Sequence, residues 1–139
     1  MKQIFLLLAL ALSAHTAKAT DSPSASTAFK AVITQQMQAM AQDDATSAYE
    51  KITPNVQKHF QTPDLFMNMV RAGYAPVYRH KFVTFGDAGF DENGKPYQTV
   101  EILSAEGVRY TAIYFMEHED DESWKISGVV MAKAPETDA

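Results

Sequence analysis

Residues 107–131 limit the possible folds more than any other part of the sequence. They contain two runs of mostly β-branched and aromatic residues, at about 108–117 and 123–132, separated by an acidic segment at 119–122. Such residues favour strands, and a polar segment between two runs of this kind is typical of a hairpin turn. The sequence therefore predicts two long antiparallel strands, and the other elements must extend or cover their sheet.

Two further strands are predicted before this hairpin, over about 77–85 and 97–104. The Asn93-Gly94 pair between them is typical of a tight hairpin turn. Gly86 and Gly89 indicate a bend or bulge before Phe90. Together the four runs predict an antiparallel meander.

Hydrophobic residues before the sheet recur at helical spacing. This spacing predicts helices over about 27–42, 45–52, 54–60 and 63–72. Asp44 is expected to cap the second helix, and Thr53-Pro54 and Thr62-Pro63 each combine a capping hydroxyl with a proline at the first helical position. Helices followed by strands predict an α+β domain, with the N-terminal helices packed on a curved four-stranded antiparallel sheet.

The first residues predict export. Lys2 supplies a positive charge, residues 4–14 form an apolar run, and Ala-Lys-Ala at 17–19 has the pattern that signal peptidase recognises. We expect a signal peptide over 1–19, cleaved after Ala19, and a periplasmic or secreted bacterial protein. An uncleaved interfacial helix is the alternative. A stable membrane anchor is not expected, since a span needs about twenty apolar residues.

The remaining residues fit one domain. We expect a flexible lead-in over 20–26, a single α+β domain over 27–132 and a disordered tail over 133–139. The sequence has no cysteine, which excludes disulfides, a thiol nucleophile and a cysteine-bound metal. Without Lys2 and Lys18 the chain keeps 10 basic and 17 acidic residues, a formal charge of −7 that disfavours nucleic acid as a partner.

Core and capping positions in the helical half form a recognisable set. They are Ile33-x-x-Gln36, Asp43-Asp44, Ala48-Tyr49, Thr53-Pro54, Phe60, Phe66, Met69-Val70 and Tyr74-x-Pro76-Val77. This set resembles a bacterial family, domain of unknown function 4864, over about residues 28–132. That family has no assigned activity, so the resemblance implies no functional residues. The order of elements also resembles the nuclear-transport-factor-two-like, or cystatin-like, cone fold, which hosts isomerases, dehydratases, binding modules and dimerisation domains.

A pocket in such a fold is expected at the open end of the cone. Alternation along the strands places Tyr110 and Tyr114 on one face of the third strand, and Tyr78, His80 and Trp124 on faces of neighbouring strands that could join it. These five side chains are our candidates for ligand binding, because an apolar wall with a few polar tips suits a small molecule. The same composition also suits an aromatic core whose hydroxyls reach the rim.

Signals for catalysis are weak. His80 lies between Arg79 and Lys81, and the sequence identifies no carboxylate to orient it. Glu101 is the one carboxylate in the interiors of the predicted strands, at 78–84, 98–103, 109–116 and 124–131, and it is expected to face solvent. The acidic segment at 117–122 is interpreted as a solvated turn rather than a cation site. No catalytic residue, cofactor or metal is therefore predicted.

The function predicted from the sequence is non-catalytic binding of a small apolar or amphipathic ligand, or of a protein partner. A homodimer is possible through the exposed sheet face, with contacts from Arg109, Thr111, Ile113 and Phe115. One alternative is a small cofactor-free isomerase or dehydratase, which requires His80 in a cavity near a carboxylate or tyrosine. The other is a structural envelope protein without a pocket.

Overall fold

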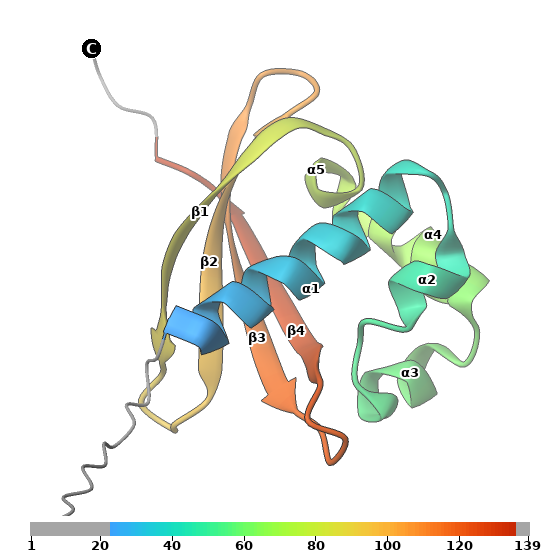
Figure 1. Cartoon of the computed structure of the whole chain (residues 1–139). Coiled ribbons are helices and arrows are strands. Elements are labelled where there is room, and N and C mark those ends of the chain that lie inside the picture. Colours follow the sequence, from blue (N-terminus) through green and yellow to red (C-terminus); the bar gives the residue numbers. More distant parts are fainter. Residues whose placement is uncertain (1–22, 136–139) are drawn as a thin grey trace, which may run out of the picture.

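Helices come first and strands last in residues 23–135, the part of the chain that the computed structural model describes (Figure 1). The elements are α1 (Pro23–Ala41), α2 (Ala45–Tyr49), α3 (Pro54–Phe60), α4 (Pro63–Gly73), α5 (Ala75–Tyr78), β1 (His80–Phe90), β2 (Pro96–Ser104), β3 (Arg109–His118) and β4 (Trp124–Lys133). This order confirms the predicted α+β class. The predicted signal peptide over 1–19 and the end of the predicted tail, 136–139, lie outside the described residues.

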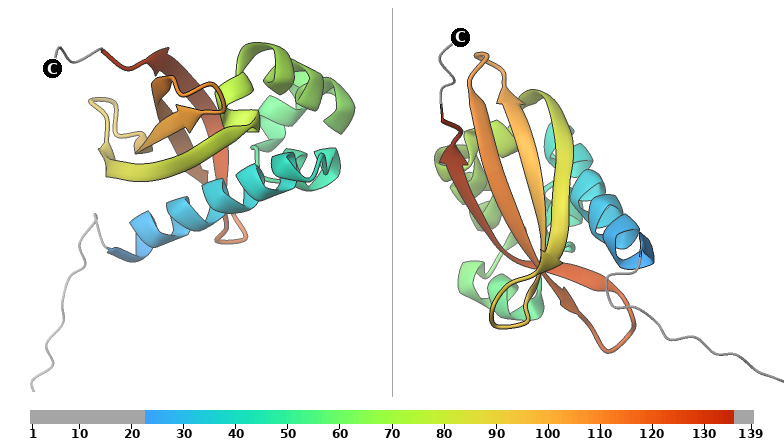
Figure 2. Two further views of the ribbon diagram at one scale, coloured as in Figure 1. Left: turned by 90° about the horizontal axis from the view of Figure 1, so that it is seen from above. Right: turned by 90° about the vertical axis from the view of Figure 1, so that its left-hand side faces the viewer.

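The four strands form one antiparallel sheet in the order β1-β2-β3-β4, as predicted for a meander. The strand register sets which side chains share a face, and Tyr114 of β3 lies between Gln98 of β2 and Val129 of β4. The register shifts after Phe85 in β1 and after Phe115 in β3. Such irregularities bend a sheet, and this sheet curves around the helices (Figure 2).

The concave face of the sheet and the helices enclose the hydrophobic core. Its buried side chains are Phe29, Ile33, Met37, Ala39, Met40, Ala48, Ile52, Phe66, Met67, Val70 and Val77 from the helical half, and Val100, Ile102, Ala112, Tyr114, Met116 and Ile126 from the strands. Full burial of a large apolar side chain contributes roughly 1.5–3 kcal/mol. The core therefore holds α1 across the sheet.

Three helices begin at the capping residues that the sequence predicts. The side-chain oxygens of Asp44, Thr53 and Thr62 accept hydrogen bonds from the backbone N–H groups of Ser47, Val56 and Leu65, at 3.1, 3.3 and 3.1 Å. Each cap satisfies an N–H group that the first helical turn leaves unpaired. The short helices α2, α3 and α4 consequently start at defined points beside the sheet.

Two helical boundaries differ from the prediction. α1 begins at Pro23 instead of 27, so residues 23–26 of the predicted lead-in are helical. α5 covers Ala75–Tyr78, where the first strand was predicted to begin at 77. In both places a proline occupies the first helical turn, where its missing N–H costs nothing. β1 therefore begins at His80 and runs on to Phe90.

One edge of the sheet is tied to the segment between α2 and α3. The N–H of Ile126 in β4 donates to the carbonyl of Lys51 at 2.8 Å, and the N–H of Thr53 donates to the carbonyl of Ile126 at 3.0 Å. These bonds make a one-residue parallel bridge between Ile52 and Ile126. They fix the start of α3 close to β4.

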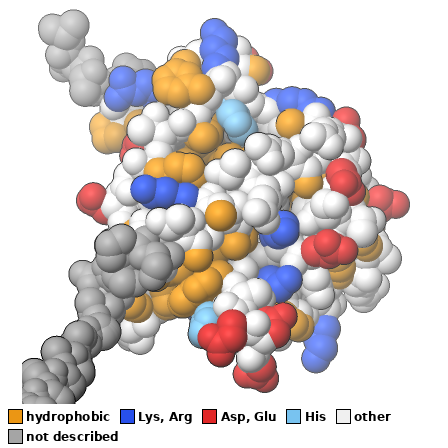
Figure 3. Space-filling model, viewed as in Figure 1, with side chains coloured by type: hydrophobic (Ala, Val, Ile, Leu, Met, Phe, Trp, Pro, Cys, Tyr) orange, Lys and Arg blue, Asp and Glu red, His pale blue; other side chains and the backbone are white. Residues whose placement is uncertain are grey.

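No described element covers the convex face of the sheet (Figure 2). Phe82 and Val130 are 57% and 56% exposed, and Ile113 and Phe115 are half-buried. On the side of the molecule seen in Figure 3, acidic side chains gather mainly over the helices and the β3–β4 turn. Within residues 23–135, no helix is long and apolar enough to span a membrane.

Candidate functional site

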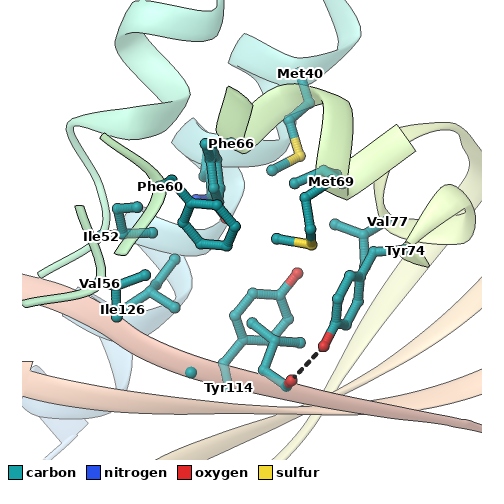
Figure 4. A pocket seen from close by; sticks show the side chains of 14 residues that line it. Met40, Ile52, Val56, Phe60, Phe66, Met69, Tyr74, Val77, Tyr114 and Ile126 are labelled. Atoms are coloured by element: carbon teal, nitrogen blue, oxygen red, sulfur yellow. Dashed lines mark hydrogen bonds between the residues drawn. The ribbon is translucent and has the colours of Figure 1, made fainter. Parts of the chain in front are cut away.

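A cavity of about 250 Å³ lies between the helices and the concave face of the sheet, next to β3 and β4 (Figure 4). The side chains and backbone that line it are those of Gln36, Met40, Ile52, Val56, Phe60, Phe66, Met69, Val70, Tyr74, Val77, Tyr114, Ile126, Gly128 and Val129. None of these described residues carries a formal charge at neutral pH. The wall is therefore apolar, with a few polar tips, as is common for small-molecule sites.

The burial of the lining residues locates the floor and the mouth of this cavity. Gln36, Met40, Ile52, Phe66, Val70, Val77, Tyr114 and Ile126 are buried and form the floor. Val56, Phe60, Met69, Tyr74, Gly128 and Val129 are half-buried and form the rim. The mouth therefore opens between α3, the end of α4 and β4.

The Tyr114 hydroxyl is the unusual group in this cavity. Its side chain rises from β3, and the hydroxyl points into the cavity toward Phe60 and Met69 (Figure 4). Tyr114 is 0% exposed, and its hydroxyl has no hydrogen-bond partner among the described residues. Leaving such a buried group unsatisfied costs about 1–3 kcal/mol. Unpaired buried polar groups are rare in folded proteins. The described residues hold three, Gln98 Oε1, the Tyr114 hydroxyl and Ser127 Oγ, and of these only Tyr114 lines the cavity.

Burial also fixes the protonation state of Tyr114. It raises the pKa of the phenol far above its usual value of 10.0, and the neighbouring Tyr74 acts in the same direction. Burial disfavours the charged phenolate because water no longer solvates it. Tyr114 is consequently a neutral hydrogen-bond donor and acceptor at physiological pH.

Other polar groups in and beside the cavity are already paired. Tyr74, at the end of α4, donates its hydroxyl to the carbonyl of Val129 in β4 at 3.0 Å. Gln36 donates its amide to the carbonyl of Ala48 at 3.2 Å. The first bond closes one side of the mouth and the second anchors α1 to α2. Both hold the wall in place around Tyr114.

Aromatic packing holds the helical side of the mouth. The rings of Phe60 and Phe66 meet edge to face with centroids 5.5 Å apart, and Tyr49 lies 5.9 Å from Phe66. The Tyr49 hydroxyl donates to the carbonyl of Gln57 at 2.6 Å, and the Gln57 amide donates to the carbonyl of Tyr49 at 2.9 Å. This reciprocal pair connects α2 with α3, so the rim is built from packed helices rather than from loops.

Of the five candidates from the sequence, Tyr114 lines this cavity and the other four do not. Tyr110 is half-buried and pairs with Ile102 and Lys133 in the sheet. Trp124 packs against Phe29 at 4.8 Å and against His118 at 4.6 Å between ring centroids. The sheet thus does not bring the predicted group together.

Tyr78 and His80 lie outside the cavity because α5 replaces the expected start of the first strand. The Tyr78 hydroxyl donates to Asp43, and Arg71 donates to the same hydroxyl at 3.2 Å. His80 approaches the carbonyl of Pro76 through Nδ1 at 3.3 Å. The arrangement that a catalytic His80 requires, a cavity shared with a carboxylate or tyrosine, is therefore not formed by these residues.

Most of the wall comes from helical residues that the sequence marks only as inward-facing. Phe60, Phe66, Met69 and Val70 fall on the predicted inner faces of α3 and α4. Helical periodicity identifies the buried face of a helix, but a filled core and a cavity wall share that periodicity. Tyr74 had no signal beyond its place before Pro76.

Acidic groups do not form a cation site in residues 23–135, where no cluster of three or more potential metal ligands occurs. In the β3–β4 turn, His118 lies 3.6 Å from the Glu122 carboxylate, and Asp121 accepts from the Ser123 N–H at 3.0 Å. The hydrogen bonds from Ser123 hold the pKa of the Asp121 carboxyl below its usual value. Local hydrogen bonds thus account for this turn.

Comparison with known families gives a direct result. The chain matches the family described as Domain of unknown function (DUF4864) over residues 22–139 and belongs to that family. A search of curated proteins finds no match. Family membership agrees with the resemblance seen in the helical half and carries no activity with it.

Proposed function

We propose that this protein binds a small, mostly apolar molecule in the cavity between its helices and its sheet. The observation that carries the proposal is the unpaired, fully buried hydroxyl of Tyr114 in a mostly apolar wall whose polar side chains Gln36 and Tyr74 already make hydrogen bonds. A bound molecule that pairs with this hydroxyl removes the cost of leaving it unsatisfied. Such a combination of apolar surface and one converging polar group is typical of ligand sites.

Binding without catalysis is favoured by the chemistry of the wall. General acid–base catalysis needs a group whose pKa lies near the working pH. The lining residues in the described part of the chain include no histidine, carboxylate or lysine, and burial makes Tyr114 a weaker acid. His80 lies against Pro76 instead of in the cavity. We therefore place the enzymatic alternative behind the binding function.

A native mass spectrum of the chain purified from its own compartment tests this proposal. We expect an added mass of a small molecule on the wild-type protein. The matched control is Val56→Phe, since Val56 is half-buried at the rim and a larger side chain there occupies the mouth. The added mass should disappear from that variant. Equal occupancy of both proteins would place the bound molecule elsewhere and contradict the proposal.

We also propose that two copies associate through the convex face of the sheet. A groove of about 330 Å³ on that face is lined by Phe82, Thr84, Glu101, Ile102, Leu103 and Arg109. A twofold interface brings the same patch of both copies together. Because the patch holds one acidic and one basic side chain, Arg109 of one copy can face Glu101 of the other. The predicted contacts Thr111 and Ile113 pair with Glu101 and Val130 on the same face.

Sedimentation equilibrium tests this association. Phe82→Glu should lower the fraction of dimer, because it places a charge on the exposed apolar face. Leu65→Glu is the control, since Leu65 is 50% exposed on α4, away from the sheet. A wild-type protein that stays monomeric at every concentration would rule out the dimer.

For localisation, we propose that the chain is exported and cleaved after Ala19, on the strength of the N-terminal charge, apolar run and small-residue motif. Mass spectrometry of the protein from the periplasmic and culture fractions should give a chain that begins at Thr20. Recovery of a chain that begins at Met1 from the cytoplasmic fraction would contradict export.

A further inference from the structure

We infer that the ligand of this cavity is electrically neutral and that it presents a hydrogen-bond acceptor oxygen, such as a carbonyl, to the Tyr114 hydroxyl. The inference rests on the proposed binding function and names the class of molecule that the site takes. Three features of the cavity carry it: the absence of charge in the wall, the chemistry of the free hydroxyl, and the size of the space.

The wall offers nothing that could balance a charged ligand. All fourteen lining residues in the described part of the chain are uncharged. The arginines nearest in sequence to the rim are engaged elsewhere: Arg71 and Arg79 lie 3.6 and 3.2 Å from the Asp43 carboxylate. An ion transferred into an apolar site without a partner charge carries a large desolvation penalty. A carboxylate, phosphate or ammonium group is therefore disfavoured inside the cavity.

The free hydroxyl favours an acceptor on the ligand. A phenol has one O–H donor and accepts less readily than an alcohol, because its lone pair is delocalised into the ring. The carbonyl of Val129, which pairs with Tyr114 in the sheet, already accepts from Tyr74, and the amide of Gln36 already donates to Ala48. A ligand that brings only a donor would leave the Tyr114 proton unpaired. A carbonyl, ether or hydroxyl oxygen satisfies it.

Size and wall composition limit the apolar part of the ligand. The cavity of about 250 Å³ is smaller than the 300–1,000 Å³ that drug-sized ligands occupy. Space for one ring with a short substituent is consistent with that volume. Met40 of α1 and Met69 of α4 lie side by side on the helical side of the cavity (Figure 4), and their flexible thioethers adapt to different apolar shapes. The site thus selects a ligand for its neutrality and its one hydrogen-bond acceptor more strongly than for its exact shape.

Four probes of similar size separate these features. Acetophenone is neutral with an acceptor, ethylbenzene is neutral without one, benzoate is an anion, and phenyltrimethylammonium is a cation. Affinities are measured by calorimetric titration of the wild-type protein, of Tyr114→Phe and of the rim variant Val56→Phe. We expect acetophenone to bind the wild-type protein about three- to tenfold more tightly than ethylbenzene, the range that one net hydrogen bond gives.

The variants show where and how the probes bind. In Tyr114→Phe the advantage of acetophenone over ethylbenzene should vanish while ethylbenzene itself still binds. In Val56→Phe both neutral probes should lose their affinity. The anion and the cation should bind the wild-type protein more weakly than ethylbenzene.

The outcomes that overturn the inference differ from those that overturn the binding function. Equal wild-type affinities for acetophenone and ethylbenzene, or tightest binding of benzoate or of phenyltrimethylammonium, would refute the neutral acceptor while leaving a ligand site. No binding of any probe, together with no added mass on the native protein, would refute the binding function and the inference with it.

Discussion

Two tyrosine hydroxyls in this protein stand in opposite surroundings. Tyr114 is fully buried among apolar side chains, and its hydroxyl has no partner in the described residues. Tyr78 lies at the surface of the helical half, where its hydroxyl contacts Asp43 and Arg71 and its ring stacks under Arg79 at 4.0 Å. The same functional group thus completes a cluster of charges in one region and stays unpaired in the other.

The contrast lies in what the fold itself supplies to each hydroxyl. The Tyr78 cluster connects the end of α1 with α4 and α5. Its charged side chains, Asp43, Arg71 and Arg79, each have an ion-pair or hydrogen-bond partner within the fold. Its hydrogen bonds form when the chain folds. The Tyr114 hydroxyl instead has no partner within the described part of the fold, which costs free energy in the folded chain. Because it is both unpaired and part of the cavity wall, Tyr114 is the residue on which the proposed site rests.

The largest change in the free energy of unfolding is expected from removing each tyrosine ring entirely. Tyr114→Ala should lower the free energy of unfolding by about 3–5 kcal/mol, the range measured for truncation of large buried aromatic side chains. Tyr78→Ala should lower the free energy of unfolding by clearly less than Tyr114→Ala does, because the cluster that Tyr78 joins is exposed to water. Urea denaturation of both variants at constant pH gives the two values. A larger loss for Tyr78→Ala would reverse the contrast.

Removing only the hydroxyls should give effects of opposite sign. Tyr114→Phe should stabilise the ligand-free protein by about 1–3 kcal/mol, since it deletes an unpaired buried group and keeps the ring. Tyr78→Phe should destabilise it slightly, because Asp43 and Arg71 lose a partner. Thermal unfolding of ligand-free samples measures both changes. A destabilised Tyr114→Phe would mean that the hydroxyl has a partner in solution.

The pH dependence of thermal stability should further distinguish the surroundings of Tyr78 from those of Tyr114. The hydrogen bond from Tyr78, followed by the charges of Arg79 and Arg71, holds the pKa of the Asp43 carboxyl below its usual value of 3.8. A lowered folded-state pKa stabilises the fold above the unfolded value, and that stabilisation is lost as the pH falls through the folded value. The advantage of wild type over Asp43→Asn in thermal unfolding should therefore be present at neutral pH and disappear in strong acid. An advantage that persists in strong acid would contradict this assignment.

The smallest change of stability with pH is expected from the Tyr114 hydroxyl, over the same pH range. Burial raises the pKa of its phenol well above neutrality, so Tyr114 does not titrate in acid or at neutral pH. The difference in stability between wild type and Tyr114→Phe should stay constant over that range. The same thermal-unfolding series measures it. A difference that varies with pH would mean that a titrating group acts on the hydroxyl.

Short-range signals predicted much of the fold. The capping hydroxyls of Thr53 and Thr62 act on N–H groups three residues away, so their role can be read from local sequence. Alternation along β3 correctly separated the buried Ala112 and Tyr114 from the convex face that holds Thr111. The bend expected near Gly86 coincides with the register shift in β1.

The candidate site was predicted only in part, because it depends on distances between elements that are far apart in the sequence. Tyr114 was identified from strand parity, but its lack of a partner depends on where α3 and α4 end relative to β4. Tyr78 was assigned to a strand because Pro76 fits both before a strand and within the first helical turn. The bridge between Ile52 and Ile126, which fixes α3 beside the mouth, has no local sequence signal.

The most direct test of the central claim is a methyl NMR spectrum of the protein labelled at its methionine methyl groups and titrated with acetophenone. Met40 and Met69 line the cavity, whereas Met37 and Met67 are buried outside it. We predict saturable shifts of the Met40 and Met69 methyl signals, with Met37 and Met67 nearly unchanged, and loss of those shifts in Val56→Phe. An unchanged spectrum, or shifts that spare Met40 and Met69, would contradict the claim that this cavity is the binding site.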